Sequence, residues 1–253
     1  FIVDSFPPIG AYSLRYLSST YSGAVIRVVE RGTDTEQDFT PSEITDGTLA
    51  TFCGANDGQL TKWYDQSGNS NDFIQATEAQ QPFIVNSGVL NMDGGLPFMN
   101  QLGTETIGIR GVFTFNGGGS IFGVYNSNDT ANGMIASNTG TAQYVGTMQN
   151  GSGLGQNSYG GSGGACVYRV NGSDISPVTR NQLYDLATVN ADVVVSVLNI
   201  NFDSWTEVRP FVFSINSYTQ IAKYREFILY ADDDDQSANK VAIETNIKNY
   251  YGI

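Results

Sequence analysis

The sequence predicts an all-β fold in which two antiparallel sheets pack as a sandwich. The 253 residues include 29 Gly, 14 Tyr and 14 Phe, a composition typical of many short strands joined by tight turns. Roughly a dozen strand-like segments follow one another at a spacing that favours a sandwich. We expect residues 1–253 to form a single domain, because all-β sandwiches commonly reach roughly 200 to 250 residues.

The N-terminal part is expected to contain a short helix followed by a strand. Ala11, Leu14 and Leu17 have helical spacing within residues 10–22, and the apolar run at 24–29 indicates a strand. Residues 31–48 carry five acidic side chains, so we interpret them as a solvated loop. The next ordered pieces are expected at 49–53 and 60–64.

The central part is predicted to be a succession of strands. Segments 81–85 and 89–92 are separated by an Asn-Ser-Gly turn, which indicates a hairpin. Residues 151–164 contain almost no apolar side chains and are interpreted as a loop. Further strands are predicted at 107–115, 120–125, 143–148, 165–170, 183–190, 193–201, 210–215 and 221–230.

The C-terminal part is predicted to be an amphipathic helix over residues 239–251. Ile243, Ile247 and Tyr250 recur at steps of four and three, the spacing of one helix face. Ser237 or an aspartate before it can cap this helix. The four consecutive carboxylates at 232–235 are interpreted as a solvated, mutually repelling group before the helix.

Charge and residue usage exclude several classes of protein. A formal charge of −13 and a pI near 4.2 disfavour a nucleic-acid partner. No apolar run reaches the roughly 18 to 20 residues that cross a bilayer, so membrane insertion is not expected. The chain starts at Phe1 rather than Met, so we expect a longer precursor, and a missing leader does not argue against export.

The numbers of histidine and cysteine residues limit the metal sites, catalytic triads and disulfides that the chain could form. Histidine is absent, which argues against zinc chemistry and against a Ser-His-Asp triad. Cys53 and Cys166 are the two cysteines, and the sequence leaves open whether they are bonded.

The most distinctive segment is 63–73, with the sequence WYDQSGNSNDF. Its glycine and asparagines tolerate positive φ, and its Asp, Ser and Asn side chains can bond their own backbone. We interpret it as a structural turn block. Asp65, Asn69, Asn71 and Asp72 could alternatively hold a Ca²⁺ ion, although the glycine falls at the wrong place for an EF-hand loop. No other cofactor is expected.

The turn block also carries a family resemblance. Together with AYSLR at 11–15, SGA at 22–24 and TFC at 51–53, it resembles the start of the catalytic domain of α-L-arabinofuranosidase B, glycoside hydrolase family 54. The run YREFILY at 224–230 and the closing helix resemble the last strand and helix of that family. The resemblance implies a concanavalin A-like jelly roll. It also implies retaining hydrolysis by a nucleophilic carboxylate and a carboxylic acid.

The residues that the resemblance would make catalytic are not matched. Segment 133–136, GMIA, places Ile135 at the nucleophile position, and segment 214–217, SINS, replaces the turn with the acid. The adjacent cysteine pair of the family is missing, and Gly58 stands where the partner of Cys53 is expected. We therefore predict a non-catalytic protein. If the chain does hydrolyse glycosides, the fallback catalytic candidates are Asp129, Asp203 and Glu207.

A similar scaffold with a changed site favours a carbohydrate-binding or structural surface module. Exposed aromatic rings can stack on sugars while amides and carboxylates bind the hydroxyls. The sugar-binding candidates are Tyr125, Asn126, Asn128, Asp129, Asn132, Tyr144, Tyr159 and Trp205.

The chain is also similar in general pattern to virion structural proteins of tailed phages and to secreted bacterial surface proteins. This similarity predicts a virion or extracellular location, with a glycan or other virion or surface proteins as partners and a homo-oligomer left open. The alternatives are a glycoside hydrolase of α-L-arabinofuranosidase type and a purely architectural virion protein without a ligand.

Overall fold

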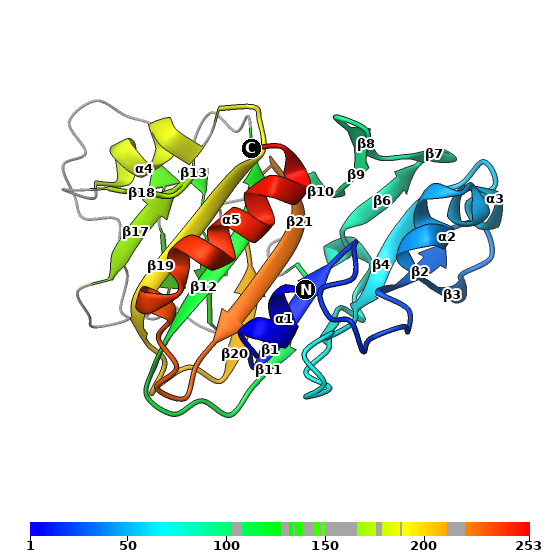
Figure 1. The fold of residues 1–253 in the computed structure, drawn as a ribbon. Helices are drawn as coiled ribbons and strands as arrows, with labels where there is room; N and C mark the ends of the chain where they lie inside the picture. Colours follow the sequence, from blue (N-terminus) through cyan, green and yellow to red (C-terminus); the bar gives the residue numbers. More distant parts are fainter. Residues whose placement is uncertain are drawn as a thin grey trace.

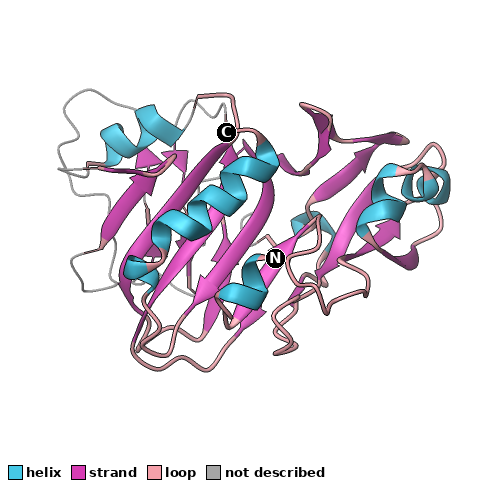
Figure 2. Ribbon diagram, in the orientation of Figure 1, coloured by secondary structure: helices cyan, strands magenta, loops and turns pink. Residues whose placement is uncertain are grey.

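The computed structural model describes residues 1–102, 108–127, 132–133, 135–138, 144–146, 148–149, 166–175, 179–187, 189–211 and 221–253. Strands dominate these residues, and helices are few and short (Figure 2). The helical elements are α1 (Ile2–Ser5), α2 (Pro41–Thr45), α3 (Thr48–Cys53), α4 (Arg180–Ala187) and α5 (Lys240–Tyr251), with 3₁₀ turns η1 (Glu78–Gln80) and η2 (Gln236–Ala238).

A large antiparallel sheet forms the framework of the molecule. Its order is β18 (Ser173–Asp174), β17 (Val167–Val170), β19 (Val193–Asn201), β12 (Gly118–Asn126), β21 (Ile221–Tyr230), β10 (Met99–Leu102), β6 (Phe83–Asn86), β4 (Gly58–Trp63), β2 (Ile26–Glu30) and β3 (Thr35–Phe39). Three short strands join this path: β1 (Gly10–Ser13) on β21, β5 (Phe73–Ile74) on β4 and β7 (Val89–Leu90) on β6.

Smaller sheets complete the β structure. One has the order β11 (Gly111–Val112), β20 (Glu207–Pro210), β14 (Ala136–Ser137) and β15 (Tyr144–Val145). Two-stranded pairs are formed by β13 (Asn132–Gly133) with β16 (Met148–Gln149) and by β8 (Met92–Asp93) with β9 (Leu96–Pro97).

Strand β12 shows how the sequence builds two apolar layers on one sheet. Side chains alternate between faces along a strand. Ile121 and Tyr125 accordingly belong to the main core, whereas Phe122 and Val124 belong to a second cluster with Ile243 of α5. Both faces of β12 are therefore covered, with α5 lying across the outer face of the sheet (Figure 1).

Buried ion pairs fix α5 on this outer face. Arg169 of β17 donates from Nε to Glu244 Oε1 at 2.7 Å and from Nη2 to Glu244 Oε2 at 3.1 Å. Glu244 lies in α5 and is 2% exposed. Removing one partner would leave the other buried without compensation, so this pair holds α5 at a defined position.

The predicted fold class is confirmed: the chain is an all-β sandwich with a short N-terminal helix and a C-terminal helix. The predicted strand boundaries at 193–201 and 221–230 coincide with β19 and β21. The hairpin at 81–92 is confirmed by the pairing of β6 with β7. The C-terminal helix begins one residue later than predicted.

The predicted helix at 10–22 is wrong, and the N-terminal helix lies earlier, at α1. Residues 10–13 form β1, in which Gly10 pairs with Leu229 and Ser13 with Glu226. All four residues of β1 are buried. Pairing with β21 therefore overrides the helical spacing of the apolar residues.

Two further assignments are corrected by the structure. Residues 31–48 are not only a loop, because they contain β3 at the sheet edge and α2, which starts with a capping box between Thr40 and Glu43. Residues 180–187 form α4 rather than a strand. Leu183 and Ala187 are its buried side chains, and their spacing of four is helical.

The acidic run at 232–235 bonds backbone groups instead of only facing solvent. Asp232 Oδ1 accepts from the Asn116 backbone N–H at 2.9 Å, and Asp233 Oδ1 accepts from Gly118 at 2.9 Å. Asp235 caps η2 through Ser237. These carboxylates thus hold the turn before β12 next to the end of β21.

Candidate functional site

The turn block at 63–73 owes its composition to structural hydrogen bonds. Asp65 is 4% exposed. Its Oδ1 accepts from the backbone N–H groups of Ala11 and Ser67, both at 2.9 Å. Its Oδ2 accepts from the Ser67 hydroxyl at 2.7 Å and from the Asn71 N–H at 3.0 Å. The oxygens of Asp65 are therefore committed to the fold.

The other candidate Ca²⁺ ligands also make hydrogen bonds within the chain. Asp72 accepts from the Asp65 N–H at 3.0 Å and pairs with Lys62 at 3.2 Å. The side-chain amides of Asn69 and Asn71 donate to backbone carbonyls of residues 8 and 9. Among the described residues there is no group of three or more His, Cys, Asp or Glu side chains that could hold a metal.

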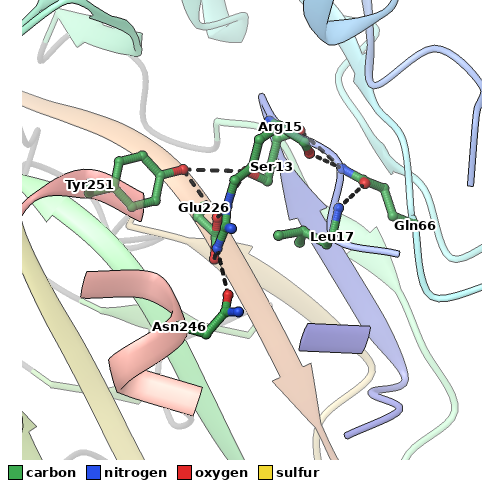
Figure 3. A network of polar contacts seen from close by, with 7 residues as sticks. All are labelled: Ser13, Arg15, Leu17, Gln66, Glu226, Asn246 and Tyr251. Atoms are coloured by element: carbon green, nitrogen blue, oxygen red, sulfur yellow. Dashed lines mark hydrogen bonds and ion pairs between the residues drawn. The ribbon is translucent and has the colours of Figure 1, made fainter. Parts of the chain in front are cut away.

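Gln66 links the turn block to the N-terminal strand. Its Oε1 accepts from the Leu17 N–H at 2.8 Å, and its Nε2 donates to the carbonyls of Ser13 and Arg15 (Figure 3). The Arg15 guanidinium in turn donates to Glu226 of β21, from Nε to Oε2 at 2.8 Å and from Nη2 to Oε1 at 3.0 Å. The segments that carry the family resemblance are therefore joined by hydrogen bonds. These contacts give a structural reason why the segments resemble those of the family.

Glu226 continues this network into the C-terminal helix. Glu226 is fully buried and accepts from the Ser13 hydroxyl at 3.0 Å and from the Tyr251 hydroxyl at 3.1 Å. Arg15 Nη2 also donates to Asn246 of α5 at 3.1 Å (Figure 3). The network thus places the end of α5 against β1 and β21.

The position expected for the nucleophile is occupied by a core residue. Ile135 is 1% exposed and belongs to the main hydrophobic cluster. Its carbonyl accepts from the Phe211 N–H at 2.9 Å. The expected acid segment, 214–217, lies outside the described residues. An apolar side chain such as that of Ile135 can neither attack a sugar nor transfer a proton.

Two of the three fallback carboxylates have structural partners. Asp203 Oδ1 accepts from the Gly117 N–H at 2.8 Å. Glu207 is 6% exposed, pairs with Arg110 at 3.1 Å and contacts Arg209. Asp129 lies outside the described residues.

Two predicted sugar platforms are buried, so the expectation that they are exposed is wrong. Tyr125 is 0% exposed and stacks on Phe211 with ring centroids 5.4 Å apart. Trp205 is 3% exposed and packs edge-on against Phe202 at 5.2 Å. Both rings point into the sandwich because they lie on the inner side of their strands or loops.

Most of the remaining sugar-binding candidates are not described by the structure. Asn128, Asp129 and Tyr159 lie outside the described residues, as does the side chain of Asn132. Tyr144 is half-buried in β15. Asn126 has a described side chain and lines a pocket.

That pocket has a volume of about 310 Å³ and forms where distant segments meet. Asp93 and Gly94 come from the β8–β9 hairpin, Asn126 from the end of β12, Asn190 and Asp192 from the segment before β19, and Tyr251 from α5. The volume lies at the small end of typical ligand pockets. We name this cavity the Asn126 pocket.

Arg225 holds two of the segments that line the Asn126 pocket. It lies in β21 and is 1% exposed. Its Nη1 donates to the carbonyls of Leu96 and Pro97, both at 2.7 Å, and its Nη2 donates to the Asp93 carbonyl at 3.0 Å. Its Nε lies 2.9 Å from Asp192 Oδ2. One buried cation therefore fixes both the hairpin and the segment before β19.

Asn126 leaves one hydrogen-bond acceptor unused at this site. The residue is 3% exposed, and its Nδ2 donates to Asp192 Oδ1 at 3.2 Å. That bond fixes the amide orientation. Its Oδ1 is buried and accepts from none of the described residues. A buried polar atom without a partner is costly and is a feature that functional sites can contain.

Asp93 supplies a charged acceptor on the rim. Its side chain is 42% exposed, and its Oδ2 lies 2.6 Å from Lys223 Nζ. The hydrogen bond from Lys223 lowers the pKa of Asp93. Asp93 is therefore a carboxylate at neutral pH, suited to accepting hydrogen bonds and not to donating a proton.

Sequence reasoning missed Asp93, Asn190, Asp192 and Tyr251 as lining residues of this pocket. The only local signals were the Gly-Gly turn after Asp93 and the polar Asn-Ala-Asp segment at 190–192. Neither signal shows that the two turns meet, because that meeting depends on Arg225 and the sheet order.

The two cysteines are free in the structure. Burial raises the pKa of Cys53 to about 11 and that of Cys166 to about 11, so neither is a reactive thiolate at neutral pH. A Cβ placed on Gly58 would lie 2.7 Å from Cys53 Sγ. Gly58 is thus adjacent to Cys53, as the resemblance implies for its missing partner.

Comparisons with known proteins give a match in structure and not in sequence. No protein-family model and no curated protein sequence matches the chain. The fold is similar to a GH54 α-L-arabinofuranosidase soaked with a cyclic sulfate inhibitor, with a TM-score of 0.59 and 15% identity. It is also similar to an arabinofuranosidase complexed with arabinofuranosyl-α-1,2-xylobiose, with a TM-score of 0.57 and 15% identity.

Both matches cover 99% of this chain but 64% of the matched proteins, so the chain spans about two thirds of their length. Identity at this level shows the fold and does not transfer the activity. The resemblance in fold that the sequence motifs predicted is confirmed. This chain has the concanavalin A-like sandwich fold of the GH54 α-L-arabinofuranosidases.

Proposed function

We propose that the protein is a non-catalytic carbohydrate-binding module that holds its ligand in the Asn126 pocket. The observation that carries this proposal is the Asn126 pocket of about 310 Å³, which is lined by Asn126 and by the carboxylate residues Asp93 and Asp192. Sugar hydroxyls are donors of the kind that these carboxylates can accept.

The absence of a suitable pair of reacting acids among the described candidates supports a binding role. Retaining hydrolysis needs a nucleophilic carboxylate and a second, protonated carboxyl group. Ile135 occupies the expected nucleophile position, and Glu207 is held by two arginines. Ile135 cannot react with a sugar, and the ion pairs of Glu207 give that carboxylate a structural role, which supports binding as the function.

The proposal is tested by combining a binding assay with an activity assay. Amide chemical shifts are measured during titration with arabinose, xylose, glucose and their disaccharides, and hydrolysis of an aryl α-L-arabinofuranoside is followed separately. We expect shifts confined to the β8–β9 hairpin, the end of β12 and residues 190–192, without turnover. Turnover above the uncatalysed rate would contradict the non-catalytic role.

One observation favours a glycoside hydrolase as the second candidate. Asp93 and Asp192 both line the Asn126 pocket. In this reading Asp93, whose pKa Lys223 lowers, would serve as nucleophile, and Asp192 would have to donate the proton. The ion pair between Asp192 and Arg225 opposes that role. Turnover that is abolished by both Asp93→Asn and Asp192→Asn would establish this candidate.

The setting that we propose for the binding role is a phage virion or a secreted bacterial surface protein. Its support is the general pattern of a sandwich closed by a C-terminal helix. No helix among the described residues is long and apolar enough to cross a membrane. A saccharide panel without binding, together with multimers seen by light scattering, would instead favour a purely architectural protein.

A further inference from the structure

The charged residues that line the Asn126 pocket are both hydrogen-bond acceptors. Asp93 and Asp192 contribute carboxylates, and the other lining residues carry no charged side chain. The hydroxyl of Tyr251, which also lines the pocket, already donates to Glu226. A ligand that brings hydrogen-bond donors therefore suits these two carboxylates.

The cations that balance these carboxylates lie outside the lining of the pocket. Arg225 is 1% exposed, donates to three backbone carbonyls and forms an ion pair with Asp192. Lys223 is held at 2.6 Å by Asp93 Oδ2. Neither side chain is among the lining residues. A ligand consequently meets the negative ends of both ion pairs.

This arrangement distinguishes between saccharides by their charge. An ammonium group is a cation with three donors and no acceptor, and charge-assisted hydrogen bonds to carboxylates are stronger than neutral ones. A ligand carboxylate would instead lie next to acceptors of like charge. The formal charge of −13 on the whole chain acts in the same direction.

We propose that the Asn126 pocket selects saccharides with a free amino group, binds neutral saccharides more weakly and rejects saccharides with a carboxylate. This inference rests on the proposed function and adds the class of sugar. It assigns the carboxylate of Asp93 to the ligand's positive charge.

The experiment compares four sugars that share one pyranose ring. Calorimetric or NMR titrations at pH 6 use glucosamine, N-acetylglucosamine, glucose and glucuronate. We expect glucosamine to bind about tenfold more tightly than glucose, N-acetylglucosamine to fall to the neutral level and glucuronate to give no signal. Raising the salt concentration should reduce the preference for glucosamine because it screens charge at the half-exposed Asp93.

A matched pair of charge variants tests whether the preference resides in the pocket. Asp93→Asn keeps the side-chain shape and should bring the affinities for glucosamine and glucose to the same level, because the neutral amide cannot form a charge-assisted hydrogen bond with the ammonium group. Asp34→Asn removes one charge from the β2–β3 turn, where Asp34 is 73% exposed and pairs with Arg31. This control should leave the preference intact, and melting curves verify that both variants are folded.

The outcomes separate the inference from the function on which it rests. Equal affinity for glucose and glucosamine, or tighter binding of glucuronate, would overturn the charge selection and leave carbohydrate binding in place. A preference lost equally in Asp34→Asn and Asp93→Asn would assign it to overall charge and overturn the role of the pocket. Failure of every saccharide to bind would overturn the proposed function itself.

Discussion

The turn block at 63–73 and the Asn126 pocket share residue types, but these residues have different roles in the two regions. Both contain Asp, Asn and Gly residues. In the turn block, both oxygens of Asp65 accept from backbone or hydroxyl donors of the chain itself. In the pocket, Asn126 Oδ1 has no such donor among the described residues. The two regions therefore differ in whether their polar side-chain atoms have hydrogen-bond partners within the chain, and not in residue composition.

The largest effect is expected from Asp65→Ala in the turn block. The change removes four accepted hydrogen bonds and leaves buried backbone donors unsatisfied, which should lower the free energy of unfolding by about 3 to 5 kcal/mol. Denaturant unfolding measures the loss. Asp65→Asn keeps part of the accepting capacity and should be less harmful. A loss below about 1 kcal/mol for the alanine variant would contradict the structural role.

A smaller effect of the same kind is expected from Asn71→Leu. Asn71 Nδ2 donates to the Ile9 carbonyl at 2.8 Å, and losing this bond should cost about 1 to 2 kcal/mol. Sugar binding should be unchanged, because Asn71 does not line the Asn126 pocket. Thermal unfolding and a titration with the sugar ligand check both expectations.

The matched change Asn126→Leu should show the opposite pattern. It removes an unpaired acceptor together with one bond to Asp192, so the free energy of unfolding should change by less than about 1 kcal/mol. Sugar affinity should fall about tenfold, which corresponds to about 1.4 kcal/mol. Unchanged affinity would show that Asn126 Oδ1 does not meet the ligand.

The pH dependence of binding should follow Asp93. Because the hydrogen bond from Lys223 lowers its pKa, the carboxylate stays ionised throughout neutral and weakly acidic pH. Its favourable contribution is present above the ordinary value of about 3.9 and is lost as the pH falls through the lowered value. Glucosamine affinity should therefore be constant from about pH 7 to 5 and decline below about pH 4. Asp93→Asn should remove this decline.

The smallest effect is expected from Ca²⁺. The oxygens of Asp65 that could bind a cation already accept four hydrogen bonds, so millimolar Ca²⁺ or EDTA should leave the melting temperature unchanged. Differential scanning calorimetry measures this. A clear rise in the melting temperature with Ca²⁺, abolished by Asp65→Asn, would show that the turn block binds a metal ion. It would contradict a purely structural role for this segment.

The sequence predicted those parts of the fold whose pattern is local. The alternating apolar runs of β19 and β21 were placed with their correct bounds, because side-chain alternation and burial are both encoded in adjacent residues. The C-terminal helix was likewise visible from Ile243 and Ile247. In contrast, β1 was mistaken for a helix, because its strand conformation is imposed by pairing with β21, more than 200 residues away.

The candidate site was only partly predictable. Asn126 was identified, but Tyr125 and Trp205 were expected on the surface and lie in the core. A single strand pattern does not reveal which face the sandwich covers, and β12 is covered on both. Asp93 and Asp192 were missed because both are held by Arg225, which is remote from Asp93 in the sequence.

The fold class, the turn block and the presence of Ile135 at the expected nucleophile position could be inferred from the amino-acid sequence, because each depends on neighbouring residues or on a motif. Which polar groups form hydrogen bonds within the chain, and which have no partner, became visible in the folded structure. The reason is that their partners are remote: Ala11 bonds Asp65 across 54 residues, and Lys223 bonds Asp93 across 130. No local pattern reports such a bond or the acceptor left without one.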